Sequence, residues 1–358
     1  MKYYMPTKVY HETDAVKNHG EEMALFGKKA LIVTGRHSAR DNGALRDVME
    51  ALERTDTAYA VYDNVAENPT VDCVMEAALL GRREGTDFVI GIGGGSPMDA
   101  AKAVALMVQN RDSSGELLYQ PVSLRALPVV EVPTTCGTGS EVTPYAILTR
   151  HDKQTKQSIS HRIFPDLALV DAKYLRYAPQ SVITNTAIDA LGHLLESYFH
   201  STATDYSRMF CQYGMEVWGT AVNILYGVEP EDGDYDSLLF ASSLAGMAIS
   251  HTSTSLPHAM SYYLTYHKGI PHGKAVGLFL PGYLRALPEQ FEMQIVMVLR
   301  LLGFGSLEQF EGFIREMLGE PPLLEEEKEE LVEGMLANTA KLATAPFEVT
   351  EEVLRGIV

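Results

Sequence analysis

The chain has 358 residues, of which 46% are hydrophobic and 21% charged, a composition typical of a soluble globular protein. This length exceeds what one ordinary hydrophobic core supports and predicts two domains. The net charge of −18 at pH 7 argues against nucleic-acid partners, because no basic surface is available to neutralise phosphates. No apolar run approaches the roughly 18 residues of a membrane-spanning helix, so we expect no membrane partner.

Short apolar runs alternate with helical patterns in the first half of the chain. Strands are predicted at 29–35, 58–62, 87–92 and 127–132, and helices at 43–54 and 71–84. Strands that alternate with helices imply a doubly wound parallel sheet. The strands are apolar almost throughout, which is typical of a sheet covered by helices on both faces.

The strand predicted at 87–92 runs directly into the glycine-rich loop Gly93-Gly94-Gly95-Ser96, and we expect the next helix to begin near Pro97. Glycines let backbone N–H groups approach a pyrophosphate closely, and the start of a helix attracts the anion. Such a loop between a strand and a helix is typical of a nucleotide site. A tight turn is the alternative, because the loop lacks the GxGxxG spacing and follows the third predicted strand rather than the first.

A second polar segment, residues 133–144, follows the strand predicted at 127–132 and is rich in threonine, serine and glycine. Its hydroxyl groups can hydrogen-bond the ribose, phosphate and amide groups of a dinucleotide. A solvent-exposed loop held by serine and threonine turns is the alternative. We favour binding, because a generic loop rarely concentrates so many of these residues.

Helical patterns replace this alternation after Pro179. Apolar stripes predict helices at 182–200, 209–226, 235–251, 282–302, 307–318 and 325–342. We therefore predict an α/β domain at residues 1–180 and an all-helical domain at residues 181–358.

Four residues of the helical half form a candidate metal site. Asp189 and His193 are spaced i,i+4 in a predicted helix and project from one face, whereas His258 and His272 each follow a proline further along. One carboxylate and three imidazoles suit Fe²⁺ or Zn²⁺, and a metal with an open position can polarise an alcohol or carbonyl oxygen. An Asp-x-x-x-His pair alone also arises by chance, so the nucleotide loops of the first half strengthen this interpretation.

Six motifs in order resemble the iron-containing (group III) alcohol dehydrogenase family, and most closely its short bacterial branch with 1,3-propanediol and butanol dehydrogenases. The motifs are Glu67 to Thr70, Gly93 to Lys102, Pro133 to Thr143, Asp189 to His193, His258 to Met260, and Pro271 to Gly273. The resemblance implies a dehydroquinate synthase-like architecture, with an N-terminal dinucleotide domain, an all-helical C-terminal domain and catalysis in the cleft between them.

The resemblance also implies roles for individual residues. The family's metal-ligand positions fall on Asp189, His193, His258 and His272. Its cofactor-contact positions fall on Gly94, Gly95, Ser96, Asp99, Thr134, Thr135, Thr138 and Ser140, and its ribose-contacting lysine falls on Lys156.

The end of the first predicted strand bears on the choice between NAD and NADP. An acidic residue there would bind the ribose 2′-hydroxyl and repel a 2′-phosphate. This chain has Gly35 instead, followed by Arg36 and Ser38, which leave room for the phosphate and supply donors. We therefore assign Gly35 and Ser38 to the cofactor site and predict a preference for NADP(H) over NAD(H). A solvated surface role for Arg36 is the alternative.

Two positions depart from the family pattern. Many members carry a histidine four residues after the third ligand, often discussed as a proton relay, where this chain has Tyr262. An ordinary tyrosine stays protonated until about pH 10 and cannot replace a histidine near neutrality. We assign no catalytic residue beyond the metal ligands, and leave Tyr262 and nearby His267 open. Cys136 stands where alanine is usual, and a small buried thiol is a conservative replacement.

Together these observations predict a metal-dependent, NAD(P)-linked alcohol dehydrogenase or aldehyde reductase. Hydride passes directly between the nicotinamide and a small primary alcohol, diol or aldehyde, while Fe²⁺, or alternatively Zn²⁺, polarises the substrate oxygen. A glycerol dehydrogenase-like polyol oxidoreductase usually keeps three protein ligands, whereas four are predicted here. A dehydroquinate synthase-like lyase would need more basic residues around a phosphorylated acid. A non-catalytic nucleotide-binding homologue would be favoured by loss of a ligand.

The three cysteines, Cys73, Cys136 and Cys211, are widely spaced and match no zinc or redox motif, which indicates a reducing compartment. The first residues lack the apolar core of a signal peptide. We therefore predict a cytoplasmic protein, and from the resemblance a homo-oligomer, dimeric or larger.

Overall fold

The computed structural model describes residues 3–111 and 113–358, which divide into two compact units. One unit runs from Tyr4 to Pro179, and the other comprises Tyr3 and Gln180–Val358. The division lies one residue before the boundary predicted from the change in sequence pattern. Among the described residues, no helix is both long and apolar enough to cross a membrane.

The first unit is built on a six-stranded sheet in which all neighbouring strands are parallel, in the order β1-β8-β5-β4-β2-β3. The strands are β1 (Lys8–His11), β2 (Lys29–Thr34), β3 (Ala58–Tyr62), β4 (Phe88–Gly93), β5 (Val129–Pro133) and β8 (Leu167–Val170). A separate antiparallel hairpin is formed by β6 (Ile147–Arg150) and β7 (Thr155–Ser158).

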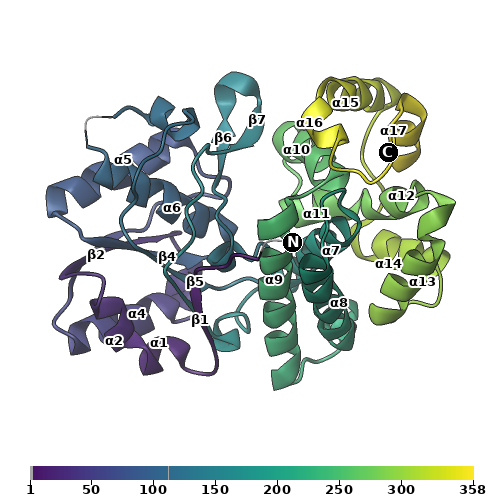
Figure 1. Cartoon of the computed structure of the whole chain (residues 1–358). Helices are drawn as coiled ribbons and strands as arrows, with labels where there is room; N and C mark the ends of the chain where they lie inside the picture. Colours follow the sequence, from purple (N-terminus) through teal and green to yellow (C-terminus); the bar gives the residue numbers. More distant parts are fainter. Residues whose placement is uncertain (1–2, 112) are drawn as a thin grey trace. The chain divides into compact units, whose positions relative to one another are not determined.

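Helices cover both faces of this sheet (Figure 1). Successive side chains of a strand point to opposite faces, so Leu31 and Val33 enter one apolar core while Ala30 and Ile32 enter the other. The first core is covered by α5 (Val71–Glu84) and α6 (Gly95–Gln109), and the second by α1 (Ala15–Asn18), α2 (Gly20–Ala24), α3 (Ser38–Asp41) and α4 (Ala44–Arg54). The predicted doubly wound parallel sheet is therefore confirmed. Short 3₁₀ turns complete the unit at η1 (Gly115–Tyr119), η2 (Ser140–Val142), η3 (His151–Lys153) and η4 (Ala172–Tyr174).

The glycine-rich loop differs from its prediction in two respects. It follows the fourth strand in sequence order rather than the third, because the four-residue strand β1 was not predicted. Helix α6 also begins at Gly95 rather than near Pro97, so that Gly94 alone separates it from β4. The N–H groups at the start of α6 therefore lie directly at the carboxyl end of the strand.

The second unit is helical throughout its described part, as predicted for the C-terminal domain. Helices α7 (Gln180–Phe199), α8 (Asp205–Thr220) and α9 (Asp232–Thr252) pack against one another. The remaining helices are α10 (Leu256–Lys268), α11 (His272–Gly277), α12 (Leu280–Arg285), α13 (Glu292–Leu301), α14 (Leu307–Leu318), α15 (Glu325–Ala337), α16 (Thr339–Leu342) and α17 (Glu351–Ile357), with 3₁₀ turns at η5 (Val222–Tyr226) and η6 (Glu289–Phe291).

Three of the predicted long helices are interrupted. The pattern at 282–302 spans α12 and α13, which are separated around Pro288, a residue that disrupts the interior of a helix. The pattern at 325–342 breaks at Asn338, whose side chain caps α16 by accepting from the Lys341 N–H. The helix predicted at 209–226 was placed too late, because α8 begins directly after its cap, Thr204. It is also interrupted, because α8 ends at Thr220 and the 3₁₀ turn η5 follows. Helices α10 and α11, which carry His258 and His272, were not predicted.

Candidate functional site

Helix α7 supplies the first two predicted metal ligands. It is buried along most of its length, and Asp189 and His193 are only 3% and 5% exposed. Their i,i+4 spacing places both side chains on one face of this helix. A carboxylate this deeply buried requires compensating partners, because desolvation of a charge is costly.

The other two histidines come from the starts of two later helices. His258 lies in the first turn of α10, where Ser255 precedes the helix and Pro257 fits the first helical positions. His272 is the first residue of α11 and follows Pro271. Both helices pack against α7. In both cases a proline marks the start of the helix, and the histidine that follows it is held next to α7.

Gly273 explains how closely α11 approaches α7. A Cβ atom at this position would overlap the backbone oxygen of Asn185 and would lie 2.9 Å from the Cβ of Asp189. Only glycine allows this approach, which places neighbouring His272 beside the Asp189 carboxylate.

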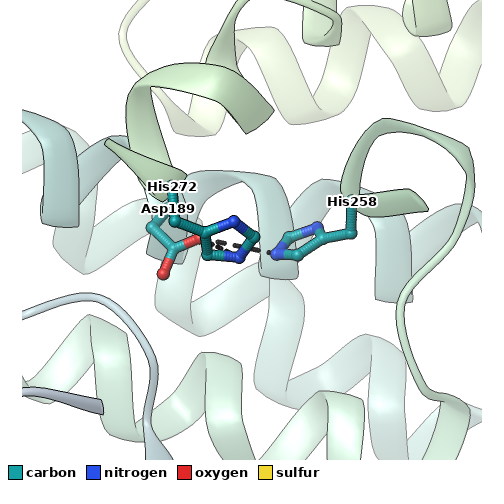
Figure 2. Close-up of side chains that lie close together, drawn as sticks. All are labelled: Asp189, His258 and His272. Carbon is teal, nitrogen blue, oxygen red and sulfur yellow. Dashed lines mark ion pairs between the residues drawn. The ribbon is translucent and has the colours of Figure 1, made fainter. Parts of the chain in front are cut away.

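The three side chains of Asp189, His258 and His272 converge (Figure 2). The Oδ1 atom of Asp189 lies 3.4 Å from Nε2 of His258 and 3.8 Å from Nε2 of His272. One potential ligand atom from each residue lies within 4.8 Å of the other two. This spacing would allow the three atoms to coordinate one metal ion, whose bonds to nitrogen and oxygen are about 2 Å long.

His193 lies beside this cluster and is not one of its three members. Its ring stacks on that of His258, with 4.3 Å between the ring centroids and an interplanar angle of 23°. His193, one of the four predicted ligands, is therefore adjacent to the other three but contributes no atom to the point where their ligand atoms converge.

Two atoms of the cluster show that it suits a metal. Asp189 Oδ1 and His258 Nε2 are buried and have no hydrogen-bond partner among the described residues. Buried polar groups are almost always paired, and these two point toward each other without hydrogen-bond alignment. A divalent cation between them would satisfy both, so the residues fit the metal that the sequence predicted.

Glu196 fixes His258 from the opposite side of its ring. This fully buried carboxylate accepts hydrogen bonds from His258 Nδ1 and from the Ser255 N–H. The bond leaves Nε2 as the ring nitrogen that faces Asp189, as in carboxylate–histidine–metal arrangements. Glu196 was not predicted as a site residue. Its position seven residues after Asp189, on the same face of the helix, was visible in the sequence, but its contact with His258 was not.

Burial and charge act in opposite directions on the ionisation of the cluster. Burial alone would raise the pKa of Asp189, but His193, His272 and His258 hold it below its ordinary value. Burial alone would lower the pKa of His258, but Glu196 and Asp189 raise it to about 9. The Asp189 carboxylate is therefore ionised, as a metal ligand requires, whereas His258 is protonated near neutral pH and would release its proton on binding a metal.

The two relay candidates lie in different surroundings. Tyr262 stacks near His272, with 5.8 Å between ring centroids, and is half-buried. His267 is exposed near the end of α10 and contacts the rings of Tyr263 and Tyr266. The structure thus places Tyr262, and not His267, against a residue of the cluster.

In the first unit, the two predicted nucleotide loops pack directly against each other. A Cβ atom on Gly95 would lie 2.6 Å from Thr138 Cγ2, and one on Gly94 would lie 3.1 Å from Thr135 Oγ1. Thr134, at the end of β5, donates its N–H to the Gly93 carbonyl. Side chains larger than glycine would separate the loops, so glycine at these two positions allows the loops to form one narrow cradle of backbone.

Other predicted cofactor residues join this cradle to its surroundings. The Ser96 hydroxyl accepts from the Asn68 N–H at 3.1 Å, which connects the Glu67–Thr70 motif to the start of α6. Asp99 Oδ1 accepts from the Ser140 hydroxyl at 2.7 Å, and Asp99 Oδ2 accepts from the Ile147 N–H at 2.8 Å. Both oxygens of Asp99 are therefore bonded within the protein.

The remaining predicted cofactor residues lie at the strand ends and on the hairpin. Gly35 follows β2, and Ser38 is the first residue of α3. The exposed Arg36 donates through Nε to Asn64 Oδ1 at 2.6 Å, which holds the guanidinium near the end of β2. Lys156 is half-buried on β7.

Comparison with known proteins defines the family. The profile of the iron-containing alcohol dehydrogenases matches residues 6–172, and the profile of the C-terminal region of the Fe-containing alcohol dehydrogenase family matches residues 183–317. The chain therefore belongs to the iron-containing alcohol dehydrogenase family. Membership implies a metal ion and a nicotinamide cofactor, and it supports the predicted metal-dependent alcohol or aldehyde oxidoreductase.

Individual proteins agree with this assignment. The solved structure of an iron-containing alcohol dehydrogenase from Thermotoga maritima is 37% identical, with a TM-score of 0.92 over 99% of this chain and 98% of that one. The long-chain primary alcohol dehydrogenase AdhA of Thermoanaerobacter ethanolicus is 34% identical over 72% of this chain and 65% of its own length. The NADPH-dependent butanol dehydrogenase of Clostridium saccharobutylicum is 27% identical over 80% of this chain and 74% of its own length.

Proposed function

We propose that this chain interconverts a small primary alcohol or diol and its aldehyde, with a nicotinamide cofactor and one divalent metal ion. The observation that carries the proposal is the convergence of Asp189, His258 and His272, with two buried ligand atoms that have no hydrogen-bond partner among the described residues. A metal held there would polarise the substrate oxygen and stabilise negative charge on it. Two relatives, a long-chain primary alcohol dehydrogenase and a butanol dehydrogenase, support a primary alcohol as the substrate, and the second supports a small one.

The chain's own residues would hold and orient the metal. Asp189 supplies the anionic ligand, and His258 and His272 supply imidazole nitrogens. We propose His193 as the fourth ligand, because its ring stacks directly on His258 and lies on the same face of α7 as Asp189. The oxygen and nitrogen donors suit Fe²⁺, which the family name also favours, with Zn²⁺ as the alternative.

The proposed cofactor site is the cradle formed by the two loops of the first unit. Backbone N–H groups at the start of α6 would bind the pyrophosphate. Hydroxyls of Thr134, Thr135 and Thr138 lie beside it and would bind the remaining polar groups. We propose a preference for NADP(H), because Gly35 carries no carboxylate that would repel a 2′-phosphate and the nearby Arg36 guanidinium can pair with it. One relative is named as NADPH-dependent.

A zinc-dependent polyol oxidoreductase of the glycerol dehydrogenase type is the second candidate. The observation that favours it is that only three of the four predicted ligands contribute converging atoms, and such enzymes usually keep three protein ligands. The two candidates differ in the expected metal and in the importance of His193.

Metal analysis together with two activity assays, butyraldehyde reduction and glycerol oxidation, tests both proposals. The protein would be purified anaerobically, its iron and zinc content measured, and the oxidation of NADPH and NADH followed with butyraldehyde, with glycerol oxidation measured in parallel. We expect one equivalent of iron and faster butyraldehyde reduction with NADPH. Zinc-dependent glycerol oxidation that survives His193→Ala would favour the second candidate, and full activity of a metal-free preparation would overturn both. The predicted homo-oligomeric state can be measured on the same sample by light scattering.

A further inference from the structure

The first unit contains a buried ammonium group that the proposed chemistry does not use. Lys102 lies on α6, two turns after the glycine-rich loop, and its side chain is fully buried. A lysine at such a position requires several acceptors, because its charge is costly to remove from water. The role of Lys102 can therefore be inferred from the groups that surround its ammonium.

Lys102 Nζ donates to three acceptors, and all of them lie in the segment that follows β5. They are the Ser140 carbonyl at 2.7 Å, the Ser140 hydroxyl at 2.7 Å and the Tyr145 carbonyl at 3.0 Å. An ammonium has three donors, so none remains for a ligand. Lys102 consequently cannot contact a cofactor, and every bond it makes determines where the second loop lies.

Asp99 acts on the same segment from one turn earlier in α6. Its carboxylate accepts from the Ser140 hydroxyl and from the Ile147 N–H. Asp99 and Lys102 are spaced i,i+3 and so lie on one face of the helix. Together they fasten residues 140–147 to α6, and the threonine-rich residues immediately before this segment are thereby brought to Gly94 and Gly95.

Glu131 on β5 is the countercharge of Lys102. Its side chain is fully buried, and one carboxylate oxygen lies 3.8 Å from Lys102 Nζ. Neither of its oxygens has a hydrogen-bond partner among the described residues. Glu131 thus compensates the charge of Lys102 without holding any loop, so the two members of the pair have separable functions.

We propose that Lys102 is a positioning residue for the nicotinamide cofactor: it holds the threonine-rich loop against the glycine-rich loop, while Glu131 only balances its charge. The inference rests on the proposed function of these loops as the cofactor site. Removal of Lys102 would weaken cofactor binding because Thr135 and Thr138, which pack against the two glycines, would be misplaced.

The test compares the double variant Lys102→Met/Glu131→Gln with Glu131→Gln alone. Both carry a neutral residue 131 and differ only at position 102, and Asp99 can keep its hydrogen bonds with the Ser140 hydroxyl and the Ile147 N–H in both. The dissociation constants of NADPH and NADH would be measured by titrating the fluorescence of the reduced nicotinamide, alongside kcat, thermal midpoint and metal content.

We expect Glu131→Gln to bind cofactor like the wild type. The double variant should bind it on the order of 10- to 100-fold more weakly, because the loss of three hydrogen bonds to one loop releases that loop. Its thermal midpoint should fall below that of Glu131→Gln, because the Ser140 and Tyr145 carbonyls lose their donor. Its metal content should stay unchanged, since the predicted ligands all lie in the second unit. Its kcat at saturating cofactor should change less than its KM for cofactor.

Equal cofactor affinity in the two variants would overturn the proposal. A double variant that fails to fold, or that loses bound metal and kcat at saturating cofactor together with cofactor affinity, would show instead that Lys102 acts on folding alone, and this would overturn the proposal as well. A wild-type protein that binds neither NADPH nor NADH would refute the proposed cofactor site itself, which is a separate result from failure of the Lys102 comparison.

Discussion

Charged side chains are buried in both units, and the two clusters use their polar atoms in different ways. In the first unit, Lys102 and Asp99 direct their polar atoms to backbone and hydroxyl groups of the protein itself. In the second unit, Asp189 Oδ1 and His258 Nε2 point toward each other and have no hydrogen-bond partner among the described residues. Lys102 and Asp99 are therefore fully hydrogen-bonded within the protein, whereas Asp189 Oδ1 and His258 Nε2 are free of hydrogen bonds to the described part of the chain and are placed to bind a ligand.

This difference separates residues that hold other parts of the protein in place from residues that are placed to bind a ligand. Both clusters contain side chains that the sequence motifs mark as functional, so motif membership alone does not distinguish a residue that touches a ligand from one that places another residue. Accounting for each hydrogen-bonding atom does distinguish Lys102 and Asp99 from Asp189 and His258, whereas Glu131, with two oxygens that accept no hydrogen bond from the described residues, is placed by its distance to Lys102 instead. The same accounting assigns Glu196 to support, because both of its oxygens are occupied by His258 and Ser255.

Removal of a converging ligand should have the largest effect. His272→Ala is expected to lose most bound metal and to reduce turnover by more than about 100-fold, since outer partners of metal ligands alone are worth 10- to 100-fold. Metal content and kcat are the measurements, with His251→Ala as the matched control, because His251 lies on α9 and stacks on Tyr3. Normal metal content in His272→Ala would place the metal elsewhere.

Removal of a supporting charge should have a smaller effect on the same site. Glu196→Gln replaces one of two accepting oxygens by an amide, which should weaken metal affinity by about 10- to 100-fold. Competition with a chelator measures the affinity directly, independently of turnover. Ser197→Ala is the control, because Ser197 is also buried on α7 but bonds Thr252 instead. Equal chelator sensitivity in both variants would argue against a role for Glu196.

A fully partnered histidine provides a contrast with those of the cluster. His200 is 4% exposed, its Nδ1 accepts from the Thr202 N–H, and burial lowers its pKa to about 4. Because this pKa lies below that of the unfolded chain, about 6.5, the contribution of neutral His200 is present above that value and is lost as the pH falls. We expect the free energy of unfolding to decrease by about 2 kcal/mol between pH 7 and pH 5 from this group.

The measurement for His200 is urea unfolding at several pH values, for the wild type beside His200→Gln. The variant should be less stable at pH 7 but should lose less stability on acidification. Parallel pH profiles of the two proteins would show that another group governs acid sensitivity.

The cofactor preference should respond modestly to a change at the end of β2. Arg36→Ala is expected to lower the ratio of kcat/KM for NADPH over NADH by about tenfold, since a hydrogen bond to a charged group is worth 1.5–3 kcal/mol and this one is exposed. Arg40→Ala is the matched control, because Arg40 is a neighbouring exposed arginine that pairs with Asp63 at 2.6 Å. A wild-type preference for NADH would refute the prediction outright.

The smallest effect is expected at the departure from the family pattern. Tyr262→Phe should leave kcat within about twofold of the wild type, because a tyrosine hydroxyl does not titrate near neutrality. The pH–rate profile for aldehyde reduction should show no break between about pH 6 and 7.5. A break near pH 6.5 that disappears only in His267→Ala would show that the exposed His267 carries the proton, contrary to this expectation.

The parts of the fold that were predicted well are those set by local signals. Helix α5 was predicted to the residue, because Thr70 caps its start and Gly85, with φ of +67°, ends it. Strand β1 was missed, because its four residues show no pattern of their own and pair with β8, far along the chain. Long-range pairing of this kind leaves no local trace.

The candidate site follows the same rule. The i,i+4 spacing of Asp189 and His193 was readable, because both lie on one helix. The contact of Glu196 with His258 was not, because it depends on how α10 packs against α7. Likewise, the i,i+4 spacing did not show that His193 stacks on His258 and lies outside the converging set. The glycine at 273 was visible in the sequence, but its reason, the backbone of Asn185, lies on another helix.

The three converging ligands come from helices α7, α10 and α11, which are separated in sequence and meet only in the folded chain. A metal bound to all three would crosslink these helices. The site exists only after folding has brought the helices together, so the unfolded chain would not bind the metal in the same way. Binding that requires the folded state adds to its stability, by about 2.7 kcal/mol when the free metal exceeds its dissociation constant 100-fold. The supply of metal would therefore affect the stability of the helical unit as well as the rate of the reaction, and chains without metal would unfold more readily.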